Sequence, residues 1–169
     1  MPLAGEELLQ ETAKLLRLPM RFDAKVNRLT IRDKVESRQF HIELPAKSQL
    51  LYLYAALRKL GPERDNPTFL RALMELNLFG LQTSTATLSL DGATDALLVH
   101  LSYPVEFLTP QLLVNIIGNF VAAARKLRGK VENLVIVTNQ ELRRSKSHFS
   151  VADALDKDKI KENVRIIRI

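Results

Sequence analysis

Residues 70–104 read LRALMELNLFGLQTSTATLSLDGATDALLVHLSYP, and this stretch decides the fold of the chain. Apolar side chains recur at helical spacing over residues 69–78, and the Phe79-Gly80 pair that follows is typical of a helix end. Two segments of alternating apolar and polar residues come next, joined at Asp91-Gly92, and they predict two strands. The stretch offers packing surface and strand edges but no catalytic pattern, so it favours a protein that holds another chain.

The residues before this stretch predict one helix and three strands. Residues 5–17 form an amphipathic pattern in which leucines recur at helical spacing and two glutamates lie in the first turn, where the helix dipole favours acids. The apolar period then changes to two over residues 28–32, 39–44 and 51–56, which predicts three strands. Each strand has one apolar face, as expected for an antiparallel sheet that is covered on that side.

The residues after this stretch complete the predicted domain. Residues 110–128 predict a long helix with a broad apolar face, followed by a stop at Gly129. The expected element order is therefore helix, strand, strand, strand, helix, strand, strand, helix. This order predicts an α+β fold in which helices pack on one twisted antiparallel sheet. We expect this domain to comprise residues 1–129.

The last forty residues, 130–169, are expected to form a C-terminal extension with a strand-helix-strand pattern. The segment LVIVT at residues 134–138 predicts a strand. Residues 150–162 predict a short helix with a start that resembles a capping box. The final segment VRIIRI, residues 164–169, predicts a closing strand.

The composition fits a soluble cytoplasmic protein with one modest core. The chain has 169 residues, and 46% of them are hydrophobic. The absence of cysteine excludes disulfides and thiolate metal sites and fits a reducing compartment. Neither a secretory signal pattern nor an apolar run of membrane-spanning length is visible in the sequence.

The chain is basic, with a formal net charge of +6. Such a balance is found in proteins that bind nucleic acid or anionic lipid. Here, however, lysines and arginines are spread along the chain among acidic residues, and the densest cluster is the short run Arg143, Arg144 and Lys146. Aromatic residues make up only 6%, and none lies among basic residues in a single-strand-binding pattern. A solvated surface is therefore favoured over a nucleic-acid site.

No catalytic pattern stands out in the sequence. The three histidines, His41, His100 and His148, show no metal-ligand spacing, and the first two fall on polar positions of predicted strands. Glycine-rich phosphate loops and the nucleophile elbow are absent from the sequence. We therefore expect no enzymatic activity, no metal and no cofactor.

Four segments carry a resemblance to a known family. They are LLQETAKLLRLPMRFD at residues 8–23, LLYLYAAL at 50–57, LMELNLFGLQTSTATLSLD at 73–91 and ALLVHLSYP at 96–104. Together with the element order, they make residues 5–128 resemble the Tir-chaperone (CesT-like) family, the class I chaperones of type III secretion systems. The chain departs from the family pattern in being basic and in continuing for about forty residues beyond the last family helix.

The resemblance implies a role in protein export from the bacterial cytosol. Such chaperones are homodimers that bind an N-terminal segment of one or more secreted effectors, keep it extended and help deliver it to the export apparatus. They hydrolyse no nucleotide, and the export ATPase is a separate partner. Two alternatives remain open: a regulatory protein of the same fold that sequesters a transcription regulator, and a basic nucleic-acid-binding domain.

The resemblance also implies two binding surfaces. We expect an effector segment to add a strand to a sheet edge and to place apolar side chains against the first helix and the first three strands. For any single residue of that surface, a core position is favoured about two to one over a groove position. The expected effector-binding residues are Leu8, Leu15, Leu29, Ile31, Phe40 and Ile42, and the expected dimer-interface residues are Leu73, Leu76, Leu78 and Phe79.

The C-terminal extension has three possible roles. It adds strands to the domain, it covers the effector groove as an internal mimic, or it docks an export component through Arg143, Arg144 and Lys146. The first role is favoured over the other two.

Overall fold

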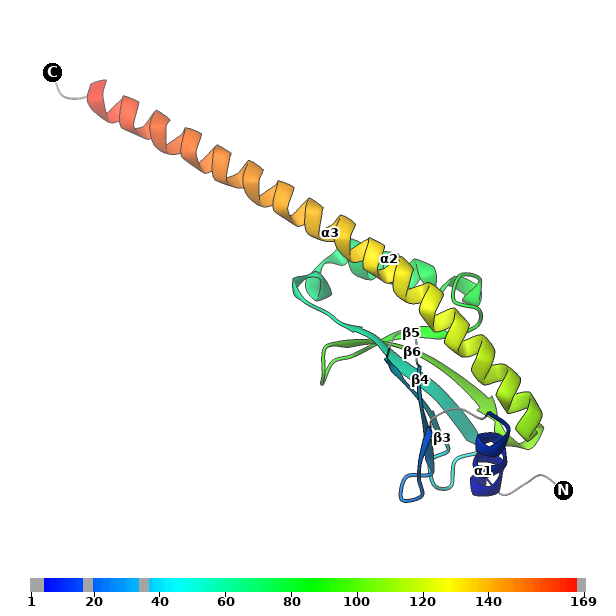
Figure 1. Ribbon diagram of the computed structural model, residues 1–169. Coiled ribbons are helices and arrows are strands. Elements are labelled where there is room, and N and C mark those ends of the chain that lie inside the picture. Colours follow the sequence, from blue (N-terminus) through cyan, green and yellow to red (C-terminus); the bar gives the residue numbers. More distant parts are fainter. Residues whose placement is uncertain (1–4, 17–19, 34–36, 167–169) are drawn as a thin grey trace.

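The computed structural model describes residues 5–16, 20–33 and 37–166. Side-chain burial and contacts are described only for residues up to 144, and not for residues 20 and 142. An α+β arrangement results, in which three helices accompany one sheet (Figure 1). The elements are α1 Gly5–Leu16, β1 Met20–Asp23, β2 Arg28–Arg32, β3 Gln39–Glu43, β4 Leu50–Lys59, α2 Pro67–Leu76, β5 Thr87–Asp91, β6 Ala96–Pro104 and α3 Pro110–Ile166, with short 3-10 turns at Pro62–Asp65, Leu78–Gly80 and Val105–Phe107.

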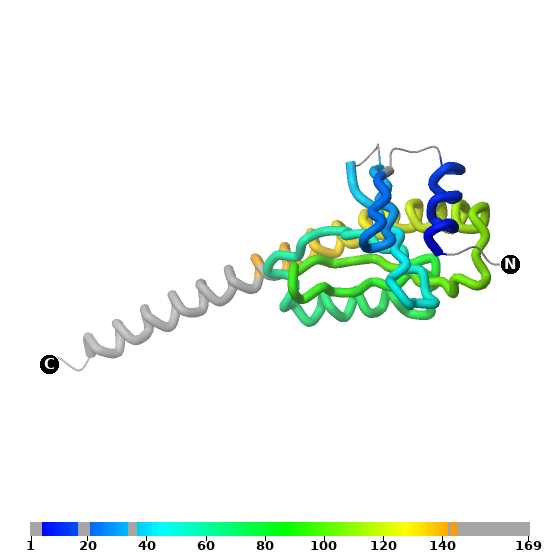
Figure 2. The backbone as a smooth tube through the Cα atoms, turned by 90° about the horizontal axis from the view of Figure 1, so that it is seen from below, coloured from blue at the N-terminus to red at the C-terminus, as the bar shows by residue number. Residues whose placement is uncertain are grey.

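The sheet has six strands in the order β1-β2-β3-β4-β6-β5, and every neighbouring pair is antiparallel. The predicted α+β class and antiparallel sheet are confirmed. Strand β1 is an addition to the prediction, because its four residues are too few to show a period of two. Figure 2 shows the twist of the sheet, with the blue strands turned strongly away from the green ones.

The core lies on one face of the sheet, because alternate strand residues point toward the helices. The central residue Leu53 is fully buried and pairs with Ile42 on one side and Leu101 on the other. On α3, the ring of Phe120 meets Phe40 edge to face, with ring centroids 6.2 Å apart. Leucines from α1, α2 and α3 join the same buried cluster. A single core therefore holds all three helices against one face.

Helix α2 begins at Pro67, two residues before the apolar pattern that predicts it. The Asn66 side chain accepts a hydrogen bond from the backbone N–H of Phe69 at 3.0 Å, and Pro67 occupies the first helical turn. This cap fixes the helix start, so that Phe69, Leu73 and Leu76 face the core. The other side of α2 is left to solvent.

Helix α3 is longer than the sequence predicts. It continues through Gly129, so the predicted stop there is wrong, and residues 134–138 are helical rather than a strand. The reason is a helical period that continues past the glycine: Leu127, Val131, Val135 and Thr138 are all buried.

The rest of the expected extension falls partly inside α3. Residues 150–162 belong to this helix, as do 164–166 of the predicted closing strand, which is therefore wrong for those three residues. The last three residues of the chain lie outside the described ranges. The division of the chain between residues 129 and 130 stays a prediction. No helix in the described ranges has the length and apolarity needed to cross a membrane.

A buried ion pair joins β4 to the helical layer. The Glu63 carboxylate is almost fully buried and lies 3.3 Å from Nη2 of Arg58, whose Nη1 lies 2.6 Å from a carboxylate oxygen of Glu132 on α3. Removing the guanidinium leaves a buried carboxylate without its counter-charge, which is costly in a low-dielectric interior.

We predict that Arg58→Gln lowers the free energy of unfolding by about 2 kcal/mol, less than the full cost of breaking a buried pair because Arg58 is partly exposed. Urea denaturation measures the change. The matched control is Arg64→Gln, which removes ion pairs to the exposed or half-exposed Asp65 and Asp95 and is expected to cost about 0.5 kcal/mol. Equal losses for the two variants would contradict this assignment.

Candidate protein-binding surfaces

An exposed apolar patch lies at the end of α2. Met74 is on the solvent side of the helix, and Leu78, Phe79 and Leu81 follow in the turn after it. All four are more than half exposed, and Phe79 is 87% exposed. We call these four residues the α2-turn patch. Large apolar groups gathered on a surface in this way are typical of contact sites for other proteins.

The backbone of the turn holds the patch in an unusual conformation. Phe79 has φ 52° and ψ 16°, a left-handed geometry that bulky side chains rarely adopt. The next residue, Gly80, also has a positive φ, and a Cβ atom there would lie 2.9 Å from Cα of Thr85. The N–H of Thr85 donates to the carbonyl of Gly80 at 3.0 Å and closes the loop. Backbone strain of this kind, combined with an exposed aromatic ring, points to a functional surface.

The β5 edge of the sheet is closed by a side chain. Asn77 follows α2 directly, and its side-chain oxygen accepts from the N–H of Leu88 at 2.7 Å. The amide nitrogen of the same side chain donates to the carbonyl of Leu88 at 3.0 Å. The second residue of the edge strand therefore already has partners for both of its backbone groups. Another strand would have to displace Asn77 to pair there.

The β1 edge is different. Strand β1 pairs with β2 from Met20↔Ile31 to Asp23↔Arg28. On its other side, β1 has no strand neighbour among the described residues. Of its side chains, Phe22 is partly buried against the core, while Arg21 is exposed. An extended peptide can add to an edge of this kind.

The face of the sheet opposite the core carries a polar row of residues. A row of paired positions crosses all six strands, and each of its members is at least partly exposed. These positions are Arg21, Thr30, His41, Tyr54, His100 and Thr87. No residue of this row is apolar, so the face is suited to contact with water or with a polar ligand.

A hydrogen-bonded network organises the centre of this polar face. His41 stacks on Tyr54 with ring centroids 5.0 Å apart, and its Nδ1 lies 3.1 Å from the Thr30 hydroxyl. The Tyr54 hydroxyl donates to Glu43 at 2.8 Å, and Arg28 donates to the same hydroxyl at 3.4 Å. Burial, together with the positive charge of Arg28, lowers the pKa of His41. The neutral form of His41 is therefore favoured.

An open groove of about 550 Å³ lies beside this network on β1, β2 and β3. Three guanidinium groups and one carboxylate contribute to its walls. The lining residues are Arg21, Asp23, Arg28, Thr30, Arg32, Gln39 and His41. We call this site the basic groove.

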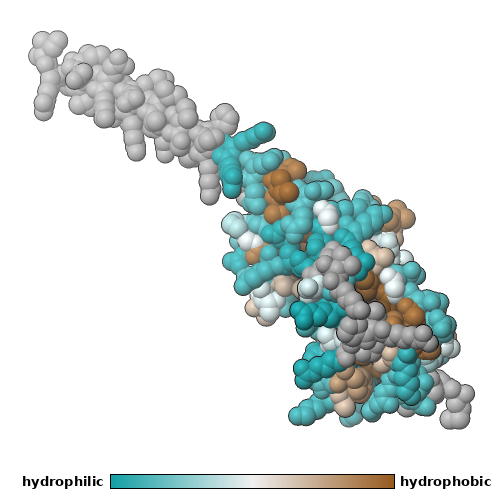
Figure 3. Space-filling model, viewed as in Figure 1, coloured by the Kyte–Doolittle hydropathy of each residue, from teal (hydrophilic) through white to brown (hydrophobic). Residues whose placement is uncertain are grey.

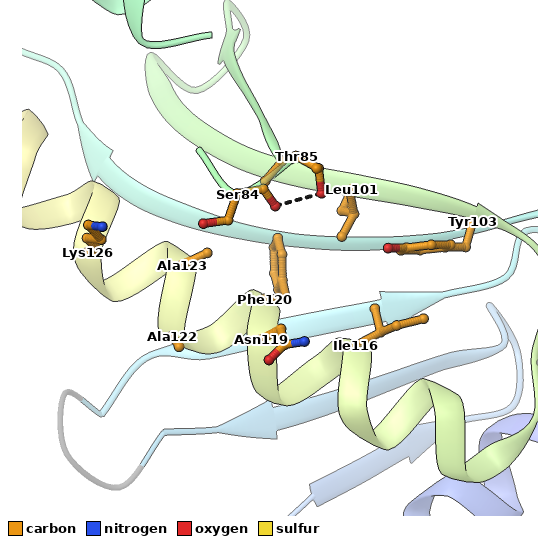
Figure 4. Close-up of a pocket in the computed structure, with 11 residues that line it drawn as sticks. Ser84, Thr85, Leu101, Tyr103, Ile116, Asn119, Phe120, Ala122, Ala123 and Lys126 are labelled. Carbon is orange, nitrogen blue, oxygen red and sulfur yellow. Dashed lines mark hydrogen bonds between the residues drawn. The ribbon is translucent and has the colours of Figure 1, made fainter. Parts of the chain in front are cut away.

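A second cavity, of about 410 Å³, lies between α3, β6 and the turn at Ser84-Thr85 (Figure 4). The ring of Phe120 points from the helix toward this turn, and Tyr103 lies along β6. Its polar groups comprise hydroxyls, one amide and Lys126, without an acid or a histidine to act as a base. Within the described ranges, no cluster of acids and histidines is suited to hold a metal.

Five of the six expected effector-binding residues are in the core of the protomer. The sixth, Leu15, is 48% exposed on α1 and is the member of the set that a bound chain can reach. The other five are buried, as the sequence favoured for any one of these residues: Leu8, Leu29, Ile31, Phe40 and Ile42. An effector-binding role for the set stays a prediction.

The expected dimer residues divide into two groups. Leu73 and Leu76 are buried against the protomer's own core, whereas Leu78 and Phe79 are exposed. Sequence reasoning missed the exposed neighbours Met74 and Leu81. Met74 could have been found from its spacing: it precedes Leu78 by four residues, which places both on one side of a helix.

The hydrophobic residues on the rest of the visible surface are dispersed. Figure 3 shows a mostly hydrophilic face on which hydrophobic residues lie in separate areas. Ile136 and Val137 on α3 are about half exposed. The α2-turn patch thus combines greater exposure with a left-handed backbone in one short turn.

A family model covers most of the chain. The model of the Tir chaperone protein (CesT) family matches residues 7–128. The chain therefore belongs to this family of chaperones, which confirms the resemblance found in the sequence. A search of curated proteins gave no match.

Solved structures share the fold. A chain of the HopA1–SchA chaperone–effector complex is 20% identical, with a TM-score of 0.54 over 72% of this chain and 90% of the other. A chain of the ExsC–ExsE complex is 19% identical, with a TM-score of 0.54 over 70% and 86%. A chain of the ExoT–SpcS complex from Pseudomonas aeruginosa is also 19% identical, with a TM-score of 0.52 over 72% and 94%.

We predict a pH dependence of stability that comes from His41. Because its pKa in the folded chain lies below the ordinary 6.5, the unfolded chain binds this proton first as the pH falls. The free energy of unfolding therefore decreases from about pH 6.5 down to the folded pKa and loses nothing more from this group below it.

Urea denaturation between pH 7.5 and pH 5 measures the effect. His41→Gln is expected to reduce the loss of stability over this range, while His100→Gln, on the same row, serves as the control. A loss in His41→Gln as steep as in the wild type would contradict the assignment.

Proposed function

We propose that this protein is a cytoplasmic type III secretion chaperone of a bacterium, which binds the N-terminal segment of one or more effectors and keeps it extended for export. The observation that carries this proposal is membership of the Tir chaperone family over residues 7–128. The chaperone–effector complexes among the solved structures of the same fold support it. Binding of this kind requires no catalytic group.

The active form in this proposal is a homodimer. Two copies meet through the α2-turn patch, since a two-fold contact buries the same patch on both subunits. Phe79 is the natural anchor, because its exposed ring offers a large apolar area and little conformational freedom to lose. Leu73 and Leu76 are buried in the protomer's core, so they hold α2 in place and do not touch the second copy.

The effector segment binds along the β1 edge. Its backbone pairs with the free edge of Met20–Asp23, and its apolar side chains reach the surface near Leu15 and Phe22. The β5 edge is the less suitable site, because Asn77 already occupies the backbone groups of Leu88. A segment held in this way stays extended and cannot fold on itself.

Delivery to the export apparatus, with the export ATPase as a separate partner, completes the proposed role. The exposed Arg143 and Arg144 on α3 offer a basic site for such a docking step. Truncation after Gln140, which keeps the buried residues Val131, Val135 and Thr138, tests the role of the residues that follow: intact effector binding with lost secretion supports docking, whereas tighter binding supports a cover over the groove.

We predict that Phe79→Asp converts the dimer to a folded monomer. The fold is retained because Phe79 is exposed and because aspartate accepts a left-handed backbone more readily than phenylalanine. Light scattering gives the mass, and circular dichroism checks the fold.

The matched control for this variant is Phe107→Asp, which places the same charge at another exposed phenylalanine. It is expected to remain dimeric. A dimer that persists in Phe79→Asp would count against the α2-turn patch as the interface.

We predict that Leu15→Asp reduces effector capture by about tenfold, because it places a charge beside the apolar part of the bound segment. Co-expression with candidate effectors, affinity purification and mass spectrometry measure the capture. The control is Val137→Asp, a residue of similar exposure on α3.

Limited proteolysis of the purified complex adds a second readout. The proposal expects a protected segment near the effector N-terminus. Co-purification of nucleic acid in place of a protein would refute it.

A further inference from the structure

The basic groove contains two arginines that the fold does not use. Arg21 and Arg32 are exposed, and neither forms an ion pair or a side-chain hydrogen bond with a described residue. The third arginine, Arg28, is held by Tyr54 and Glu43 through its terminal nitrogen. Its Nε is buried and has no hydrogen-bond partner in the described structure. Three guanidinium groups thus line the groove, and those of Arg21 and Arg32 have unused donors.

Few negative charges oppose these groups. Asp23 is the one carboxylate in the lining, and it accepts from the backbone N–H of Lys25 at 3.1 Å. Glu43 is engaged by the Tyr54 hydroxyl. The groove therefore has a local excess of positive charge that an acidic ligand would neutralise.

The spacing of the arginines matches an extended peptide. Arg21 on β1 pairs with Thr30 on β2, and Arg32 lies two residues further along β2 on the same face. In an extended chain, side chains on one face also repeat every two residues, or about 6.6 Å. Acidic side chains at alternate positions of a strand beside β1 would therefore lie within reach of these arginines.

We propose that the basic groove binds acidic side chains of the extended segment that the proposed function places along the β1 edge. This inference rests on that function and adds the chemistry of the segment. The segment carries glutamate or aspartate at alternate positions facing the groove, with apolar residues between them facing the core side. Selection of acidic segments explains why this surface of the chaperone is basic.

The groove is better suited to a peptide than to nucleic acid. Its lining contains no tyrosine, phenylalanine or tryptophan on which bases stack, and the ring of His41 is already stacked on Tyr54. The adjacent strand edge offers backbone hydrogen bonds, which only a peptide satisfies along its length.

Two synthetic peptides test the proposal. The first is a fluorescein-labelled 11-residue peptide with glutamate at alternate positions among valine, threonine and leucine. The second replaces every glutamate with glutamine. By fluorescence polarisation with the full chain at 50 mM NaCl, the glutamate peptide is expected to bind about tenfold more tightly than its twin, and 500 mM NaCl is expected to remove most of the difference.

A double variant tests the residues. Arg21→Gln with Arg32→Gln is expected to weaken binding of the glutamate peptide about fivefold and to leave the glutamine peptide unchanged. The control, Lys59→Gln with Lys126→Gln, removes the same net charge at exposed sites outside the groove and is expected to bind as the wild type does.

Three results would overturn the inference. Equal binding of the two peptides would do so while leaving strand addition intact. An equal loss in the control variant would show a general charge effect. A nucleic-acid site would be identified if the wild-type chain bound a 15-nucleotide oligothymidine tightly and did not bind the glutamate peptide, and if only the groove variant lost the oligothymidine. Failure of the proposed function itself is distinct, since then no effector co-purifies with the wild-type chain.

Discussion

A six-stranded sheet that is covered by helices on one face must make its other face and its two edges compatible with water. In this chain, the requirement follows from the core, in which α1, α2 and α3 all pack on the inward side chains of the strands. The outward side chains of one row that crosses the whole sheet, from Arg21 on β1 to Thr87 on β5, are consequently polar. The surfaces that the core leaves available for binding other chains are the outer face of the sheet, its two edges and the ends of the helices.

The two edges are treated in different ways, and this difference organises the proposed function. At β5, the Asn77 side chain bonds both backbone groups of Leu88 and so ties the end of α2 to the sheet. The solvent side of α2 and the turn after it carry the α2-turn patch. At β1, a short strand lies beside a groove that contains arginines with unused donors. One end of the sheet is thus suited to a second copy of the chain and the other to an extended peptide.

Sequence periodicity predicts much of this structure, since the apolar period of two identifies β2 to β6 and the helical period over residues 69–78 identifies α2. It misses β1, which is too short to show a period, and it misplaces the end of α3. There the β-branched segment at residues 134–138 favours a strand locally, yet Val131, Val135 and Thr138 continue the buried face of the helix. Burial also separates residues that the sequence treats alike: Leu73 and Phe79 are both apolar in one segment, but only Phe79 is available to a partner. The basic groove joins residues of three strands, so no linear motif reveals it.

The central claim is that a bound segment pairs with β1 and not with β5. Hydrogen–deuterium exchange of backbone amides, measured on the free protein and on its complex with a co-purified effector, tests it most directly. The account predicts that those amides of Met20–Asp23 that point away from β2 exchange fast in the free protein and are protected in the complex, while the amide of Leu88 is protected in both states. New protection at Thr87–Asp91, with no change at β1, would contradict the account.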